Sequence, residues 1–120
     1  MSTVEDLSDV LRLLREKGKR GMSPMRERWN EVYRRKGFEL GIDAGNFIIA
    51  LDEERVYALS PLVYYVWALC DGETSVGIIV ENLIQNLFQE AQKVEEDEVY
   101  QTVITIIDRL TETDLVEKVR

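Results

Sequence analysis

The chain has 120 residues, of which 45% are hydrophobic, and a formal net charge of −8 at pH 7. This length supports one domain with a core of modest size. No stretch approaches the roughly 18 consecutive apolar residues of a membrane span, so no membrane partner is expected. The N-terminus is acidic and lacks the basic start and apolar run of a secretory signal, which makes the cytoplasm the expected location.

Several kinds of active site are excluded by the residue types that the chain lacks. It contains no histidine and one cysteine, Cys70. Without imidazole there is no histidine general base, no Ser-His or Cys-His pair and no zinc site of the usual ligand types. There is no glycine-rich phosphate loop, and the consecutive acids of residues 95–98 fit a helix N-terminus. We predict that the protein is not an enzyme and has no catalytic residue, metal or cofactor, and that Cys70 is a small buried hydrophobe.

Charge is distributed unevenly along the chain. Residues 1–41 carry ten Lys/Arg and seven Asp/Glu, a net +3, whereas residues 42–120 carry five and sixteen, a net −11. The basic residues concentrate in residues 12–36. Such asymmetry is typical of an interaction arm. The alternative is that this basic segment lies against the acidic body of its own chain or of a second copy.

Two helices are predicted before residue 37. In the first, residues 2–17, Ser2 and Glu5 have capping-box spacing, and apolar residues recur at helical intervals. These apolar residues are Leu7, Val10, Leu11 and Leu14. The second begins at Ser23-Pro24, and its apolar stripe consists of Met25, Trp29, Val32 and Tyr33. Residues 1–36 are therefore interpreted as a basic N-terminal helical extension that precedes a domain of residues 37–120.

The hydrophobic period changes to two after Gly37. Three short segments, residues 38–42, 47–51 and 55–59, alternate or are rich in β-branched and aromatic residues, with polar turns between them. They predict a three-stranded antiparallel meander. The third segment carries one charged residue, Arg55, and no proline. Its edge is therefore expected to be open to a further strand.

A helix, a tight turn and a second helix are predicted next. Ser60-Pro61 provides a cap and a first-turn proline for the first of these helices. Asp71-Gly72 ends that helix and turns the chain. Thr74 or Ser75 offers the next cap. The helix that follows has an apolar face of Val76, Ile79, Val80, Leu83, Ile84 and Leu87.

The last predicted helix spans residues 96–113. Its apolar stripe consists of Val99, Val103, Ile106, Ile107 and Leu110, with Tyr100 and Ile104 on its flanks. A short extended tail follows at residues 115–119. With three strands followed by three helices, the predicted fold class is α+β.

The run from Phe38 to Val119 resembles the PqqD family, whose small domains are also called RiPP recognition elements. Three segments carry the resemblance: Val56-Tyr57-Ala58-Leu59, the helix start Ser60-Pro61, and the turn Trp67-Ala68-Leu69-Cys70-Asp71-Gly72 with Thr74-Ser75-Val76 and Ile79-Val80 after it. The resemblance implies a winged-helix-like fold without catalysis of its own. In that fold a three-stranded antiparallel sheet is followed by three helices.

What the resemblance implies about function is peptide binding. Family members bind the leader of a ribosomally made precursor peptide and present it to a modifying enzyme, often a radical SAM protein. The leader adds as a strand beside the third strand and lies against the last helix. The implied peptide-binding residues are Val56, Tyr57, Ala58 and Leu59 on the strand and Val103, Ile106, Ile107 and Leu110 on the helix. The helix residues are transferred by element, and ordinary core packing is the alternative for them.

Two other functions stay open. The first 36 residues exceed the usual family core, and Pro61 and Leu62 stand where members often carry polar or small residues. A structural homodimer or assembly subunit, joined through residues 1–36, is therefore one alternative. The other is a winged-helix DNA-binding regulator, whose recognition helix would be residues 75–88. Because that segment holds Glu81 and no Lys or Arg, and nucleic-acid affinity depends on basic groups, a nucleic-acid partner is not expected.

Overall fold

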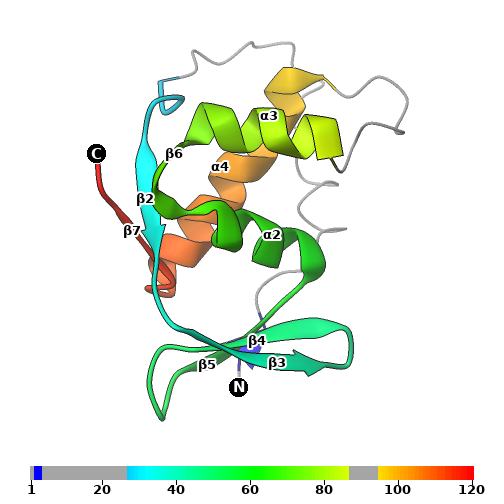
Figure 1. Cartoon of the computed structure of the whole chain (residues 1–120), viewed down its shortest axis with the longest axis vertical. Helices are drawn as coiled ribbons and strands as arrows, with labels where there is room; N and C mark the ends of the chain where they lie inside the picture. The colour runs from blue at the N-terminus through cyan, green and yellow to red at the C-terminus, as the bar shows by residue number, and fades with distance from the viewer. Residues whose placement is uncertain (1, 4–26, 87–94) are drawn as a thin grey trace.

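The computed structural model describes residues 2–3, 27–86 and 95–120, and these form an α+β protein with antiparallel sheets and three helices (Figure 1). The helices are α2 (Pro61–Leu69), α3 (Val76–Asn86) and α4 (Glu96–Glu112). One sheet lies below the helices, and a second runs along their side (Figure 1). None of the helices in these residue ranges is long and apolar enough to cross a membrane. The predicted fold class is confirmed at this level.

The first sheet contains the predicted meander. Its strands β3 (Phe38–Asp43), β4 (Asn46–Ala50) and β5 (Val56–Leu59) pair antiparallel in chain order. The turn between β3 and β4 holds Ala44 and Gly45 at φ 52° and 82°, the positive values that a two-residue hairpin turn requires. Strand β1 (Ser2–Thr3) adds to β5 in parallel, so the sheet order is β1-β5-β4-β3. The three-stranded meander is confirmed, and the fourth strand is an addition to it.

The second sheet has β2 (Val32–Arg35) at its centre, between β6 (Asp71–Ser75) and β7 (Val116–Lys118). The helix predicted over residues 24–36 is therefore wrong where the structure describes it, because residues 27–30 form a turn and β2 follows. The helix predicted over residues 2–17 is wrong at its first two residues, which belong to β1, and the rest of it lies outside the described residues. The division of the chain at residue 37 stays a prediction.

Pairing on both sides explains why β2 is a strand. Buried backbone N–H and C=O groups need partners, and Val32 and Tyr33 are each only 3% exposed. Arg34 lies opposite Asp71 on one neighbouring strand and Glu117 on the other. A β-branched and an aromatic side chain suit such a pleated surface. These tertiary contacts outweigh the helical spacing of the local sequence.

The turn after α2 is built on one carboxylate. Asp71 accepts hydrogen bonds from the backbone N–H groups of Glu73 and Thr74, at 2.9 and 2.8 Å, and from the Thr74 hydroxyl at 2.9 Å. These bonds lower the pKa of Asp71. Gly72 adopts a φ of 86°, which glycine tolerates without a steric cost. The predicted end of the helix before Asp71 is confirmed. The tight turn predicted between the two helices is wrong, because Asp71 and Gly72 are the first residues of β6, which pairs with β2 and separates α2 from α3.

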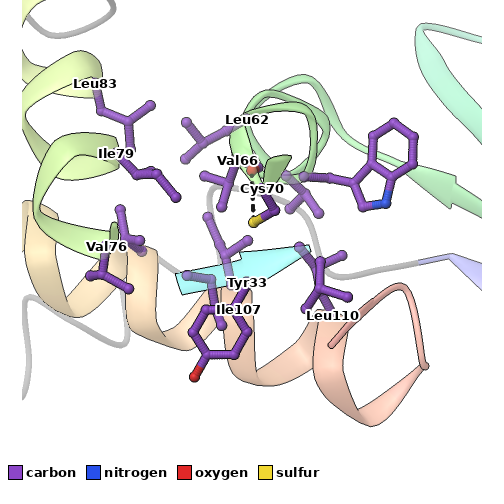
Figure 2. Packing of buried hydrophobic residues seen from close by; sticks show 14 of the residues in the cluster. Tyr33, Leu62, Val66, Cys70, Val76, Ile79, Leu83, Ile107 and Leu110 are labelled. Atoms are coloured by element: carbon purple, nitrogen blue, oxygen red, sulfur yellow. Dashed lines mark hydrogen bonds between the residues drawn. The ribbon is translucent and has the colours of Figure 1, made fainter. Parts of the chain in front are cut away.

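The core lies where the three helices meet β2 (Figure 2). Tyr33 contributes from β2 and Ile107 from α4, and Cys70 is fully buried between them and the end of α2. The Cys70 thiol donates a hydrogen bond to the Val66 carbonyl, with an Sγ–O distance of 3.3 Å. Burial, assisted by the charge of Asp71, raises the pKa of this thiol to about 12. Cys70 is thus a neutral core residue, as predicted.

Candidate functional site

The candidate site is the outer edge of β5, which the sequence predicted to be open. On its inner side β5 pairs antiparallel with β4. On its outer side Tyr57 pairs with Ser2 and Ala58 pairs with Thr3. Figure 1 shows this N-terminal strand beside β5 in the lower sheet. The expectation of an open edge is therefore corrected: the chain's own N-terminus supplies hydrogen-bonding partners that an edge strand otherwise lacks.

The four predicted residues of β5 divide between the two faces of the sheet. Side chains alternate along a strand, and paired residues share a face. Tyr57 and Leu59 lie on the face of Ile49, which is buried. Leu59 belongs to the main core cluster and Tyr57 packs against it while half-buried. Val56 and Ala58 lie on the opposite face, where Ala58 is 2% exposed and Val56 is half-buried.

The four predicted residues of α4 all lie in the core. They are Val103, Ile106, Ile107 and Leu110, each at most 1% exposed. They share one hydrophobic cluster with Leu59, so the structure does join the strand half and the helix half of the predicted set. Their burial accords with the core-packing alternative. The apolar side chain of α4 that keeps partial exposure is Ile104, which the sequence placed on the flank of the stripe.

The residues that sequence reasoning missed are Ser2 and Thr3. The sequence indicated a helix cap at Ser2, whereas the structure places both residues in β1. A two-residue strand has no measurable period. The only local signal was the β-branched side chain of Thr3, and one such residue does not predict a strand. Their role depends on a partner more than 50 positions away in the chain.

An ion-pair chain anchors the start of β5 to the end of α4. The Arg55 guanidinium lies 2.9 Å from Asp52 Oδ2 and 3.2 Å from Asp114 Oδ2. Asp52 also accepts hydrogen bonds from the backbone N–H groups of Arg55 and Glu54. Together these bonds lower the pKa of Asp52. These side chains are exposed, so solvent screens their charges and the pairs add little stability. They connect the residue before β5 to the residues that follow α4.

Aromatic stacking fixes the sheet to α2. The rings of Phe47 on β4 and Tyr64 on α2 are stacked with centroids 3.9 Å apart. The Tyr64 ring also contacts that of Trp67 in a tilted arrangement, with centroids 5.9 Å apart. A hydrogen bond with Glu39, together with burial, raises the pKa of Tyr64. The Phe47–Tyr64 stack therefore joins the first sheet to α2.

This geometry is suited to binding. Among residues 2–3, 27–86 and 95–120, no group of three or more His, Cys, Asp or Glu side chains is placed to hold a metal ion. The outer edge of β5 consists of backbone N–H and C=O groups flanked by the apolar side chains of Val56 and Tyr57. Such an edge can bind an extended chain by strand addition. The fold and this edge define a small α+β domain that has a strand edge at which an extended chain pairs.

The chain belongs to the PqqD family. Residues 48–116 match the family described as Coenzyme PQQ synthesis protein D (PqqD), which confirms the resemblance found in the sequence. The matched residues begin in β4, include β5 and all three helices, and end at the first residue of β7. No curated protein and no solved structure shows a significant match to the chain. Membership of this family supports an accessory, non-catalytic role in the biosynthesis of PQQ or of a related ribosomally made peptide product.

Proposed function

We propose that the protein captures the leader of a ribosomally made precursor peptide by strand addition at β5 and presents it to a modifying enzyme, such as a radical SAM protein. The observation that carries this proposal is that the outer edge of β5 accepts a strand, since β1 pairs there. Membership of the PqqD family indicates the kind of biosynthetic pathway in which such a capture would take place. We also assign the arrangement of the meander and three helices to the winged-helix-like class that the resemblance implied.

Strand addition fits the chemistry of this edge. Main-chain hydrogen bonds to β5 supply affinity for any extended chain, and alternate side chains of the peptide meet apolar surface that gives selectivity. Val56 and Tyr57 offer such surface because both are half-buried. No charged residue lies within Val56–Leu59. Binding that depends on these contacts is expected to change little with salt concentration.

We assign the helix residues a supporting part in this function. Val103, Ile106, Ile107 and Leu110 pack with Leu59 and hold α4 behind the strand. Direct contact of these four side chains with a peptide stays a prediction, and it requires that α4 or a neighbouring segment shift to expose them. Ile104 is half-buried in the described structure and needs no such shift.

A structural homodimer or assembly subunit is the second candidate, and the opposite edge of the sheet favours it. Strand β3 has no strand partner on its outer side among the described residues. Phe38, Leu40 and Ile42 on this strand are 72%, 62% and 67% exposed. Exposed apolar side chains on an edge strand favour association with another chain.

Photo-crosslinking in the native lysate tests the two candidates together. A photoreactive phenylalanine analogue replaces Tyr57, and a matched control carries it at Ile78 on α3, which is 48% exposed. Capture of a precursor peptide and a modifying enzyme at position 57, but not at position 78, is the result expected from the peptide-carrier function. Recovery of the protein linked only to further copies of itself would overturn that function and favour the structural candidate.

A further inference from the structure

We propose that β1 is a built-in occupant of the peptide site: Ser2 and Thr3 cover the edge of β5 and must leave before another strand can add there. The pairing joins Ser2 to Tyr57 and Thr3 to Ala58. Each outward-facing backbone group of β5 can serve one neighbouring strand at a time. Self-pairing and peptide capture therefore exclude each other at this edge. The consequence for peptide capture rests on the function proposed above.

The geometry of β1 suits a reversible cover. It pairs with the two middle residues of β5, and its ladder does not reach Val56 or Leu59 at the strand ends. Each backbone hydrogen bond contributes only about 0.5–1.5 kcal/mol net, so a two-residue ladder is weak. Because β1 belongs to the same chain, its effective concentration at the edge is on the order of millimolar. A longer incoming strand can form more hydrogen bonds and displace it.

This arrangement also explains how the apolar edge strand β5 is protected from pairing with other chains. An uncovered edge invites pairing with other chains and aggregation. Covering β5 with two residues blocks non-specific pairing, and it lowers the apparent affinity of every peptide by the same competition. A peptide that pairs along the whole of Val56–Leu59 forms more hydrogen bonds than a shorter one, so it can still bind despite this loss. The cover therefore raises the intrinsic affinity that any peptide needs in order to bind.

The test uses the full chain with two double variants. Ser2→Pro with Thr3→Pro removes both backbone N–H donors of β1, and proline is poorly tolerated in a paired strand. Ser2→Ala with Thr3→Ala changes the same side chains and keeps the backbone donors. The first readout is amide hydrogen exchange over Val56–Leu59. We expect exchange about tenfold faster in the proline variant and unchanged in the alanine variant.

The second readout is the binding of a fluorescent synthetic peptide with the sequence of residues 1–12 of this chain, measured by anisotropy. We expect it to bind the proline variant about tenfold more tightly than the wild type or the alanine variant, because the internal competitor is gone. Equal affinity for all three proteins would overturn the proposal, as would equal exchange over β5. The probe is the chain's own sequence. If it binds as expected and crosslinking at position 57 recovers no precursor peptide, the cover stands and the carrier function fails.

Discussion

At the scale of single residues, Ser60 and Ser75 occupy equivalent positions, each directly before a helix. The Ser75 hydroxyl accepts a hydrogen bond from the backbone N–H of Ile78 at 3.3 Å, so Ser75 caps α3 as the sequence predicted. Ser60 precedes Pro61 at the start of α2, but its side chain makes no capping bond. Its Oγ is buried and has no hydrogen-bond partner in the part of the chain that the structure describes. The cap predicted at Ser60 is therefore wrong, because its hydroxyl does not reach a backbone N–H of α2, although the residue stands at the predicted helix start.

This difference predicts unequal effects of two matched substitutions. Ser75→Ala should lower the free energy of unfolding by about 1 kcal/mol, because the N–H of Ile78 loses its acceptor. Ser60→Ala should change it by less than about 0.5 kcal/mol, because no hydrogen bond is lost and a buried unpaired hydroxyl is removed. Urea unfolding followed by circular dichroism measures both. A loss at Ser60→Ala as large as that at Ser75→Ala would show that Ser60 caps α2 after all.

At the scale of the element, α4 carries two adjacent apolar residues in different surroundings. Val103 is completely buried, and Ile104 is half-buried on the flank of the same helix. The helical period predicted the stripe that contains Val103, because residues three and four apart share a face. The period did not decide whether this stripe faces a core or a bound peptide. The packing of α4 against α2 and α3 decides it, since that contact encloses the stripe in the main cluster.

Arginine at each of these two positions separates the core role from a groove role. Val103→Arg should lower the free energy of unfolding by more than about 3 kcal/mol, because it places an unpaired charge in the core. Ile104→Arg, the control, should cost less than about 1 kcal/mol because its side chain can reach solvent. Thermal unfolding of the two variants and the wild type measures the difference in their unfolding temperatures. A Val103→Arg protein that unfolds at the wild-type temperature but no longer captures peptide would show that Val103 faces the groove.

At the scale of the whole molecule, one polar cluster joins the turn before β2 to α4 and β7. The Arg28 guanidinium contacts Glu31 at 2.8 Å and Asp108 of α4 at 2.9 Å. Glu31 also accepts hydrogen bonds from the Tyr33 hydroxyl at 2.7 Å and pairs with Lys118 of β7 at 3.2 Å. Burial and the Glu31 carboxylate raise the pKa of Tyr33 to about 12. The segment before β2, helix α4 and the last strand β7 therefore meet at this cluster.

The cluster predicts an acid-sensitive contribution to stability. Burial alone would raise the pKa of Glu31, but hydrogen bonds from Arg28, Tyr33 and Lys118 outweigh it and hold the pKa below the ordinary 4.5. A carboxyl group with a lowered pKa in the folded state stabilises the protein above its ordinary pKa, and this contribution is lost as pH falls through the lowered value. Glu31→Gln should therefore reduce the free energy of unfolding by about 1.5–3 kcal/mol at neutral pH. The deficit should shrink in acid, as the pH falls below 4.5 and through the lowered pKa of Glu31.

Urea unfolding of the wild type and Glu31→Gln at several pH values measures this deficit. Glu27→Gln is the matched control, because Glu27 lies in the same segment and is exposed. It should unfold like the wild type at neutral pH, because its side chain is solvent-exposed. A deficit for Glu31→Gln that is equal at neutral and acidic pH would mean that the cluster stabilises through packing and not through the carboxylate charge.

The sequence by itself determined the features that depend on near neighbours. These are the β3–β5 meander, the three helices with their apolar faces, the end of α2 before Asp71-Gly72 and the membership of the PqqD family. In each case the deciding pattern or motif lies within a short stretch of the chain. Local period and turn chemistry are therefore sufficient. The burial of Cys70 followed from its residue type and its place on an apolar helix, and Tyr33 and Ile107 complete it in the core.

Only the tertiary structure decided that β2 is a strand and that β1 covers the edge of β5. Arg34 pairs with Asp71 and Glu117, and Ser2 pairs with Tyr57. The hydrogen bonds that define these strands are made to residues remote in the chain. A short stretch of sequence around each strand therefore does not contain the residues that make it a strand. The same long-range pairing determines whether the site is open, because the backbone groups that would bind a peptide are the ones that β1 already uses.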